Sequence, residues 1–215
     1  MHKSKQSNNC SPTIETYTGK MFNILNPTLD MIDIRDIAHA GSLLCRFTGH
    51  TKFHYSVAQH ELIGSWQVPL EYALEFLLHD AAESYINDMS RPLKHMTKCG
   101  DAYRPIEERV QVLIRQTFGL PKVQSPLIHL FDNKMLMTEK KQLMSRGVWS
   151  PEEMAVCKID TTDTFDIIIA ELTPREVERN FLTRFIRLTG ERNNANHQLA
   201  VQNNHVRQVW QDYHI

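Results

Sequence analysis

Residues 69–85 read PLEYALEFLLHDAAESY, and this stretch decides the fold class. Its apolar residues recur at the three- and four-residue spacing of an amphipathic helix: Leu70, Ala73, Leu74, Leu77 and Leu78. Proline suits the first turn of a helix because the N–H that it lacks would have no partner there, so Pro69 marks a start. The pattern predicts one helix from Pro69 to Tyr85, with His79 and Asp80 near its end.

The same helical periodicity recurs on both sides of this stretch. Apolar spacing, capping residues and breakers predict further helices at 30–47, 56–66, 105–118, 125–144 and 173–190. Only Thr13 to Leu25, with Thr18-Gly19-Lys20 at its centre, has the pattern of a small β-hairpin. We therefore predict an all-α helical bundle preceded by an N-terminal hairpin. The expected segments are a flexible tail over 1–12, one domain over 13–190, and a linker with a C-terminal helix over 191–215.

Composition narrows the class of protein. The chain has 215 residues, enough for one domain with a sizeable core, and its 24 basic and 25 acidic residues nearly cancel. It therefore lacks the global positive field that non-specific nucleic-acid binding requires.

No apolar run approaches the roughly 20 residues that span a bilayer, and residues 1–11 lack the apolar centre of a secretion signal. We expect a cytoplasmic protein that binds neither nucleic acid nor membranes, and whose four separated cysteines are free thiols.

Asp80 is the first candidate for chemistry. On the predicted helix this carboxylate shares a face with Phe76 and Leu77, where lost hydration costs on the order of several kcal/mol unless the charge is paired. A metal cation would compensate, and an imidazole with a carboxylate suits first-row divalent ions such as Zn, Mn, Fe or Co. Glu83 lies one turn beyond His79, so it would face the same site as a general acid or base.

Two further polar residues fall on apolar helix faces. His60 lies between Val57 and Ile63 at neighbouring helical positions, and Asp132 follows Ile128 by one turn. Each is a candidate metal ligand, because a mononuclear site needs more than two protein ligands. Each also has a structural alternative: His60 as a satisfied core histidine, and Asp132 as the ion-pair partner of a lysine.

The order His60, then His79-Asp80, then Asp132, each on a separate helix, resembles the HD-domain metal-dependent phosphohydrolases. The chain is similar to bacterial and phage members of this family, the 5′-deoxynucleotidases and the dATP triphosphohydrolases, over about residues 13–145. The strings that carry the resemblance are Asp36-Ile37-Ala38-His39-Ala40, Cys45-Arg46-Phe47-Thr48-Gly49-His50, Ser56-Val57-Ala58-Gln59-His60, His79-Asp80-Ala81-Ala82-Glu83, Asp88-Met89-Ser90-Arg91-Pro92-Leu93-Lys94, and Asp132 followed by Glu139.

This resemblance implies an HD-domain bundle around one divalent ion, Zn, Co or Mn, that lowers the pKa of water and withdraws charge from phosphoryl oxygens. Its implied metal ligands are His60, His79, Asp80 and Asp132. The other implied roles are proton transfer by Glu83, phosphate binding by Arg46 and Lys94, and sugar contacts by Phe47 and Asp88. Without the resemblance, Arg46 and Lys94 would be ordinary surface cations. The alternative role of Glu83 is to orient a neighbouring side chain.

The implied reaction is hydrolysis of a deoxynucleotide, and we expect a dNTP triphosphohydrolase that converts dATP to deoxyadenosine and triphosphate. Three alternatives stay open: a 5′-deoxynucleotidase acting on dNMPs, a phosphodiesterase, and a non-catalytic nucleotide sensor that keeps the HD fold. The phosphodiesterase would act on cyclic nucleotides or oligonucleotides, whereas the expected partner is a small nucleotide substrate. Apolar helix faces and the behaviour of relatives make a homo-oligomer the expected assembly.

Overall fold

The computed structural model describes residues 12–156, 159 and 161–195. Its N-terminal segment is an antiparallel pair of strands, β1, Thr13–Glu15, and β2, Met21–Asn23. Gly19 adopts a φ of 82° in the turn between them, a left-handed conformation that glycine reaches without steric cost. The expected hairpin is therefore confirmed. Phe22 anchors it in the core by stacking on Tyr85, with 4.3 Å between the ring centroids.

Helices make up the other regular structure of the described chain. They are α1, Ile34–Leu43; α2, Val57–Ser65; α3, Leu70–Leu77; α4, Glu83–Ile86; α5, Arg91–Met96; α6, Lys98–Thr117; α7, Pro126–Leu143; α8, Pro151–Val156; and α9, Pro174–Ala195. Two short 3-10 helices, η1, Leu29–Met31, and η2, Arg46–Gly49, lie on either side of α1. The predicted helical fold with a small hairpin is thus confirmed, while its membership of the HD-domain class stays a prediction.

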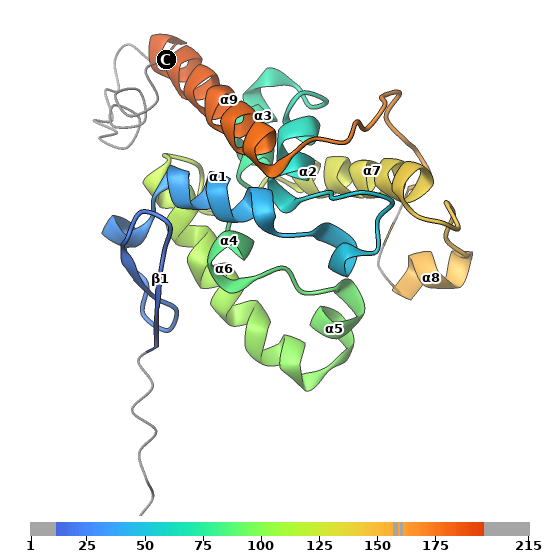
Figure 1. Cartoon of the computed structure of the whole chain (residues 1–215), viewed down its shortest axis with the longest axis horizontal. Coiled ribbons are helices and arrows are strands. Elements are labelled where there is room, and N and C mark those ends of the chain that lie inside the picture. Colours follow the sequence, from blue (N-terminus) through green and yellow to red (C-terminus); the bar gives the residue numbers. More distant parts are fainter. Residues whose placement is uncertain (1–11, 157–158, 160, 196–215) are drawn as a thin grey trace, which may run out of the picture.

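One continuous core joins helices from both halves of the chain. α9 packs against α1, α2 and α3, and Figure 1 shows this C-terminal helix (red) lying beside them. Phe181 and Phe185 of α9 are fully buried in the same core as Ile37 of α1 and Phe76 of α3. Since burying a phenylalanine side chain stabilises a fold by about 1.5–3 kcal/mol, α9 is an integral part of the domain.

The predicted single helix over 69–85 is wrong. α3 ends at Leu77, and the chain makes a turn before α4 begins. The physical reason is tertiary: the backbone N–H of Asp80 donates to Glu61 Oε1 on α2, at 3.1 Å, instead of to a helical carbonyl. His79 and Asp80 therefore lie in a turn between two helices, and not on a helix.

Several helix boundaries also differ from the prediction. The helix predicted over 30–47 is shorter, since α1 covers Ile34–Leu43 and lies between the 3-10 helices η1 and η2. α6 begins at Lys98 and not at Pro105, because Thr97 caps the earlier start with its side chain. α9 continues through Ala195, whereas we predicted a linker from residue 191. The remaining parts of the predicted tail and of the predicted C-terminal helix lie outside the described residues, in 1–11 and 196–215.

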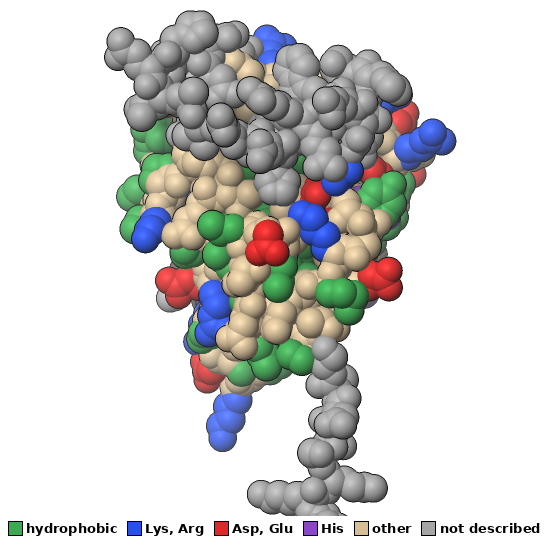
Figure 2. Space-filling view, turned by 90° about the vertical axis from the view of Figure 1, so that its left-hand side faces the viewer, with side chains coloured by type: hydrophobic (Ala, Val, Ile, Leu, Met, Phe, Trp, Pro, Cys, Tyr) green, Lys and Arg blue, Asp and Glu red, His purple; other side chains and the backbone are tan. Residues whose placement is uncertain are grey.

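The surface shows where apolar groups are exposed. None of the helices in the described part of the chain combines the length and apolar character needed to cross a bilayer. Figure 2 shows exposed apolar side chains on one face as separate patches among charged and other groups. The N-terminal segment exposes Ile14, Tyr17, Met21, Leu25 and Leu29. The homo-oligomer remains a prediction. Cys45 and Cys99 are free thiols as expected, while Cys10 and Cys157 lie outside the described residues.

Candidate metal centre

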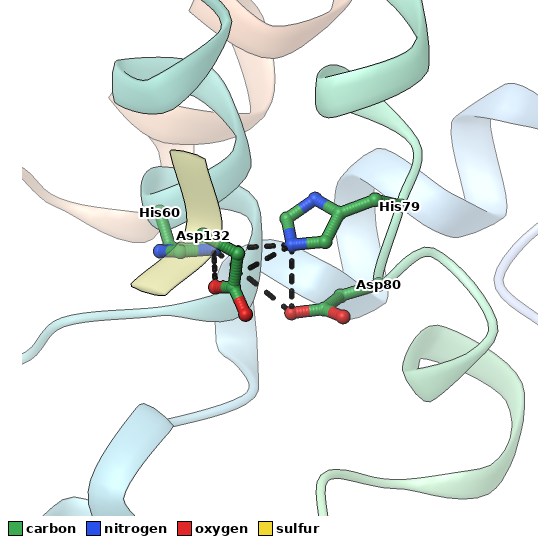
Figure 3. A group of neighbouring side chains, drawn as sticks. All are labelled: His60, His79, Asp80 and Asp132. Atoms are coloured by element: carbon green, nitrogen blue, oxygen red, sulfur yellow. Dashed lines mark hydrogen bonds and ion pairs between the residues drawn. The ribbon is translucent and has the colours of Figure 1, made fainter. Parts of the chain in front are cut away.

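Four side chains singled out by the sequence converge at one point. His60, His79, Asp80 and Asp132 each offer one ligand atom, and these four atoms all lie within 4.8 Å of one another. Figure 3 shows the two imidazoles and the two carboxylates directed toward a common centre. They come from α2, from the turn after α3, and from α7. The group could hold a metal ion, because first-row divalent ions accept these donor types.

The ligand atoms lie close together and favour a positive charge. His60 Nε2 is 3.3 Å from His79 Nε2 and 3.3 Å from Asp132 Oδ1, and His79 Nε2 is 3.3 Å from Asp80 Oδ2. Burial alone lowers the pKa of His79, but the Asp80 and Asp132 carboxylates raise it to about 10. Burial raises the pKa of the Asp132 carboxyl, but the two neighbouring imidazoles, His60 and His79, hold it well below its usual value. Such a centre attracts cations.

Both imidazoles direct Nε2 inward because Nδ1 is engaged elsewhere. His79 Nδ1 lies 2.7 Å from the carbonyl oxygen of Phe76, and His60 Nδ1 lies 2.5 Å from Glu139 Oε1. A carbonyl oxygen or a carboxylate accepts hydrogen bonds, so each Nδ1 donates. In a neutral ring, Nε2 then keeps the lone pair that a metal ligand needs.

A helix cap and a buried ring lie beside the two imidazoles. Ser56 caps α2 as predicted, since its hydroxyl accepts from the N–H of Gln59 at 3.1 Å, and His60 follows within the first turn. The Phe76 ring lies 5.6 Å from the ring centroid of His60 and 4.5 Å from that of His79. This fully buried aromatic ring restricts both imidazoles from one side.

Similarity to known proteins assigns the chain to a family. No family model matches it. The chain is 38% identical over 173 residues to the uncharacterized protein YfdR of Escherichia coli strain K12, a match that covers 80% of this chain and 93% of YfdR. The chain belongs to the YfdR family. An uncharacterized protein of Rhodobacter capsulatus is 33% identical over 115 residues, which is 49% of this chain and 58% of that protein.

In this YfdR-family chain, the predicted phosphate ligand Arg46 lies at the edge of the centre. Nη1 donates to Asp80 Oδ2 at 3.3 Å and Nη2 donates to Glu139 Oε2 at 3.2 Å. The next residue, Phe47, has a φ of 52°, which is uncommon for a bulky side chain, and its ring packs against the cluster that contains Leu136 of α7. The structure thus brings Arg46 to the four candidate ligands and places Phe47 beside it.

Glu83 begins α4, three residues after the candidate ligand Asp80. Its backbone N–H donates to the carbonyl oxygen of Asp80 at 2.9 Å, and its side chain is buried. Within the described chain, Glu83 Oε2 has no hydrogen-bond partner. Burial, reinforced by the Asp80 and Asp88 carboxylates, raises the pKa of Glu83 well above its usual value. Glu83 is therefore a buried acid that feels the charge of Asp80 and whose Oε2 makes no hydrogen bond to a described residue.

Asp88 and Lys94, the other predicted substrate contacts, follow α4 in the chain. Asp88 is half-buried, and burial raises the pKa of its carboxyl group although Arg46 lowers it. Lys94 on α5 forms an ion pair with Glu107 of α6, with 2.6 Å between Nζ and Oε1. The lysine is therefore already held by a carboxylate, and a phosphate would compete with Glu107 for it.

Sequence reasoning assigned no role to several residues that surround the centre. Arg91 Nη2 lies 3.2 Å from Asp132 Oδ2, so Asp132 pairs with an arginine and not with a lysine. The Tyr55 hydroxyl donates to Glu139 Oε1 at 2.8 Å. Only Glu139 had a signal in the sequence, because it follows Asp132 by about two turns and so shares its face of α7.

Proposed function

We propose that this chain is a divalent-metal-dependent phosphohydrolase that acts on deoxynucleotides. The observation that carries the proposal is the convergence of two imidazoles and two carboxylates within 4.8 Å. The resemblance to HD-domain enzymes supports the reaction class, because the residues of its motif are the ones that converge. Within this class we propose dNTPs as substrates, dATP first among them, with the deoxynucleoside and triphosphate as products.

The donor set fits a divalent ion. His60, His79, Asp80 and Asp132 would hold it, and both imidazoles already direct Nε2 to the centre. When bound, the ion would lower the pKa of water and withdraw negative charge from phosphoryl oxygens. Zn, Co and Mn are all candidates, because imidazole and carboxylate ligands suit each of them.

Arg46 would bind phosphate. Asp80 and Glu139 hold two of its nitrogens, while Nε is buried and has no hydrogen-bond partner in the part of the chain that the structure describes. A guanidinium fixed in one orientation loses little further freedom when it binds an anion. Lys94 would add charge, and it too is paired with a carboxylate, Glu107. Because two partners fix the orientation of the Arg46 guanidinium and one holds the flexible lysine, we expect Arg46 to contribute more than Lys94 to phosphate binding.

Glu83 would move the proton in this reaction. Hydrolysis of a phosphate ester requires a proton to leave the attacking water and a proton to reach the leaving oxygen. The buried Oε2 of Glu83 is not used in a hydrogen bond to any described residue, so it can serve this transfer. Asp88 and Phe47 would contact the sugar.

The direct test supplies each dNTP and each dNMP separately to the full-length protein loaded with Zn(II), Co(II) or Mn(II). Release of triphosphate from dATP, identified by phosphorus NMR, supports the proposal. Orthophosphate from a dNMP would instead support a 5′-deoxynucleotidase. Saturable nucleotide binding without any product would favour the nucleotide sensor and contradict the enzymatic proposal.

A pair of histidine variants separates the protein's own activity from a contaminating phosphatase. His79→Ala removes a candidate metal ligand, whereas His129→Ala removes an exposed imidazole from α7. We expect hydrolysis to be lost in the first variant and retained in the second. Equal activity of both variants would mean that the hydrolysis does not come from this centre.

A further inference from the structure

Glu139 is a fully buried carboxylate at the meeting point of three side chains. Oε1 lies 2.5 Å from His60 Nδ1 and accepts from the Tyr55 hydroxyl at 2.8 Å, and Oε2 accepts from Arg46 Nη2 at 3.2 Å. Tyr55 is itself fully buried, so its hydroxyl holds the carboxylate in place from within the core. One acidic group therefore contacts both a candidate metal ligand and the candidate phosphate-binding arginine.

The contact with His60 fixes which nitrogen faces the centre. Because a carboxylate accepts and does not donate, His60 must carry its proton on Nδ1, and Nε2 is left to face Asp132 Oδ1 at 3.3 Å. When a metal-ligating histidine donates its other ring N–H to a carboxylate, this hydrogen bond sets the orientation of the ring and raises the basicity of the ligating nitrogen. Replacing Glu139 by an uncharged group would weaken this control without removing any of the four ligands.

The contact with Arg46 extends this control to the anion side of the centre. Arg46 is held between Glu139 and Asp80, so its guanidinium plane is set by one residue outside the ligand set and one inside it. Loss of the Glu139 contact would leave Arg46 paired only through the ligand Asp80, whose oxygen a metal ion would also need. Glu139 thus shares with Asp80 the hydrogen bonds that hold Arg46.

We propose that Glu139 is a positioning residue that sets the tautomer and orientation of His60 and anchors Arg46, so that metal binding and phosphate binding depend on the same buried carboxylate. The inference rests on the proposed metal centre and adds to it a residue that touches neither metal nor substrate. Tyr55 supports the same carboxylate, so it belongs to the same unit.

The test measures Co(II) binding to the full-length protein by calorimetry and by visible absorption. Glu139→Gln is expected to weaken Co(II) binding by about 10- to 100-fold and to change the ligand-field bands, because ligand orientation changes. Tyr55→Phe is expected to change both in the same direction by a smaller factor. Glu178→Gln is the matched control, since Glu178 pairs with His39 Nδ1 at 3.2 Å away from the four ligands, and it should leave both unchanged.

The outcomes separate this inference from the proposed function. If the wild type binds Co(II) and Glu139→Gln binds it with the same affinity and spectrum, the positioning role is wrong and the centre stands. If the wild type does not bind Co(II), Zn(II) or Mn(II), the centre itself is wrong and this inference fails with it. Should Glu139→Gln not fold, as judged by circular dichroism, Tyr55→Phe decides, and unchanged binding and spectrum in that variant would overturn the proposal.

Discussion

Two buried carboxylate–arginine pairs of the described chain differ in their surroundings. Glu75 and Arg115 form the first pair, with 2.7 Å between Oε1 and Nη2. Their other partners are backbone groups of the loop between α6 and α7. Arg115 donates to the carbonyl oxygens of Pro121 and Val123, and Glu75 accepts from the N–H of Ser125. This pair therefore fixes the path of the chain.

The second pair, Glu139 and Arg46, has side chains as its further partners. Glu139 contacts His60 and Tyr55, and the nitrogen of His60 on the other side of the ring faces the metal centre. Unpartnered buried atoms do not distinguish the pairs, since Arg46 Nε and Arg115 Nη1 both lack a hydrogen-bond partner among the described residues. The kind of partner distinguishes the two pairs. Backbone partners indicate that a pair stabilises the fold, whereas partner side chains that also belong to the metal centre indicate a role in the site.

The greatest loss of turnover is expected when a ligand of the candidate metal centre is removed. Glu139 of the second pair contacts this centre through His60. Asp132→Ala should lower turnover by about 1,000-fold or more, because the charge stabilisation that a metal ion supplies is worth several kcal/mol. Turnover and bound metal, the latter by mass spectrometry, are the measurements. Asp101→Ala, which removes an exposed carboxylate paired with Arg104 on α6, should leave both unchanged. Full turnover and full metal content in Asp132→Ala would remove the centre from the mechanism.

Replacing Glu75, the carboxylate of the first pair, should lower the stability of the fold and leave metal binding unchanged. Glu75→Gln leaves Arg115 buried without its compensating charge, so we expect the free energy of unfolding to fall by about 3–5 kcal/mol. Urea unfolding of the metal-free protein measures this change. The same substitution at Glu139 should cost less stability, because Arg46 keeps Asp80 as a partner. A Glu75→Gln variant that is fully stable but binds Co(II) weakly would contradict the division of roles.

The sequence predicted those elements whose signals are local. Ser56 caps α2 and Ser125 caps α7 through their own side chains, and the hairpin follows from Gly19 in its turn. The end of α3 could not be predicted in this way. Neither glycine nor proline follows Leu77 directly, and the acceptor that replaces a helical carbonyl for the N–H of Asp80 is Glu61 on another helix.

The same distinction applies to the candidate site. Its four candidate ligands were predicted because each combines a metal-binding side chain with an apolar neighbourhood or a motif. Tyr55 and Arg91 were not predicted, because each contacts the centre only after distant segments have come together. Glu107 was missed for the same reason, since its contact with Lys94 joins α5 and α6.

Glu83 belongs to neither pair and should affect catalysis alone. Its Oε2 has no hydrogen-bond partner in the described chain, so Glu83→Gln should leave Co(II) affinity and stability nearly unchanged. Turnover should fall by about 100-fold or more, the usual worth of a proton-transfer group. Steady-state hydrolysis of dATP measures the effect, with Glu178→Gln as the control. Wild-type turnover in Glu83→Gln would assign proton transfer to another group.

The smallest effect on stability is expected from loss of the cap of α2. The capping residue, Ser56, lies close to His60 in the chain, but its hydroxyl bonds to the backbone. Ser56→Ala removes the hydroxyl that accepts from the N–H of Gln59 at 3.1 Å, and this should lower the free energy of unfolding by about 1 kcal/mol. Thr97→Ala, which removes the corresponding cap of α6, should cost a similar amount. Co(II) affinity should stay at the wild-type value in both variants, because Glu139 and not the helix start sets the His60 ring. A loss of affinity in Ser56→Ala as large as that in Glu139→Gln would show that the start of α2 positions this ligand, and would extend the functional unit to a backbone contact.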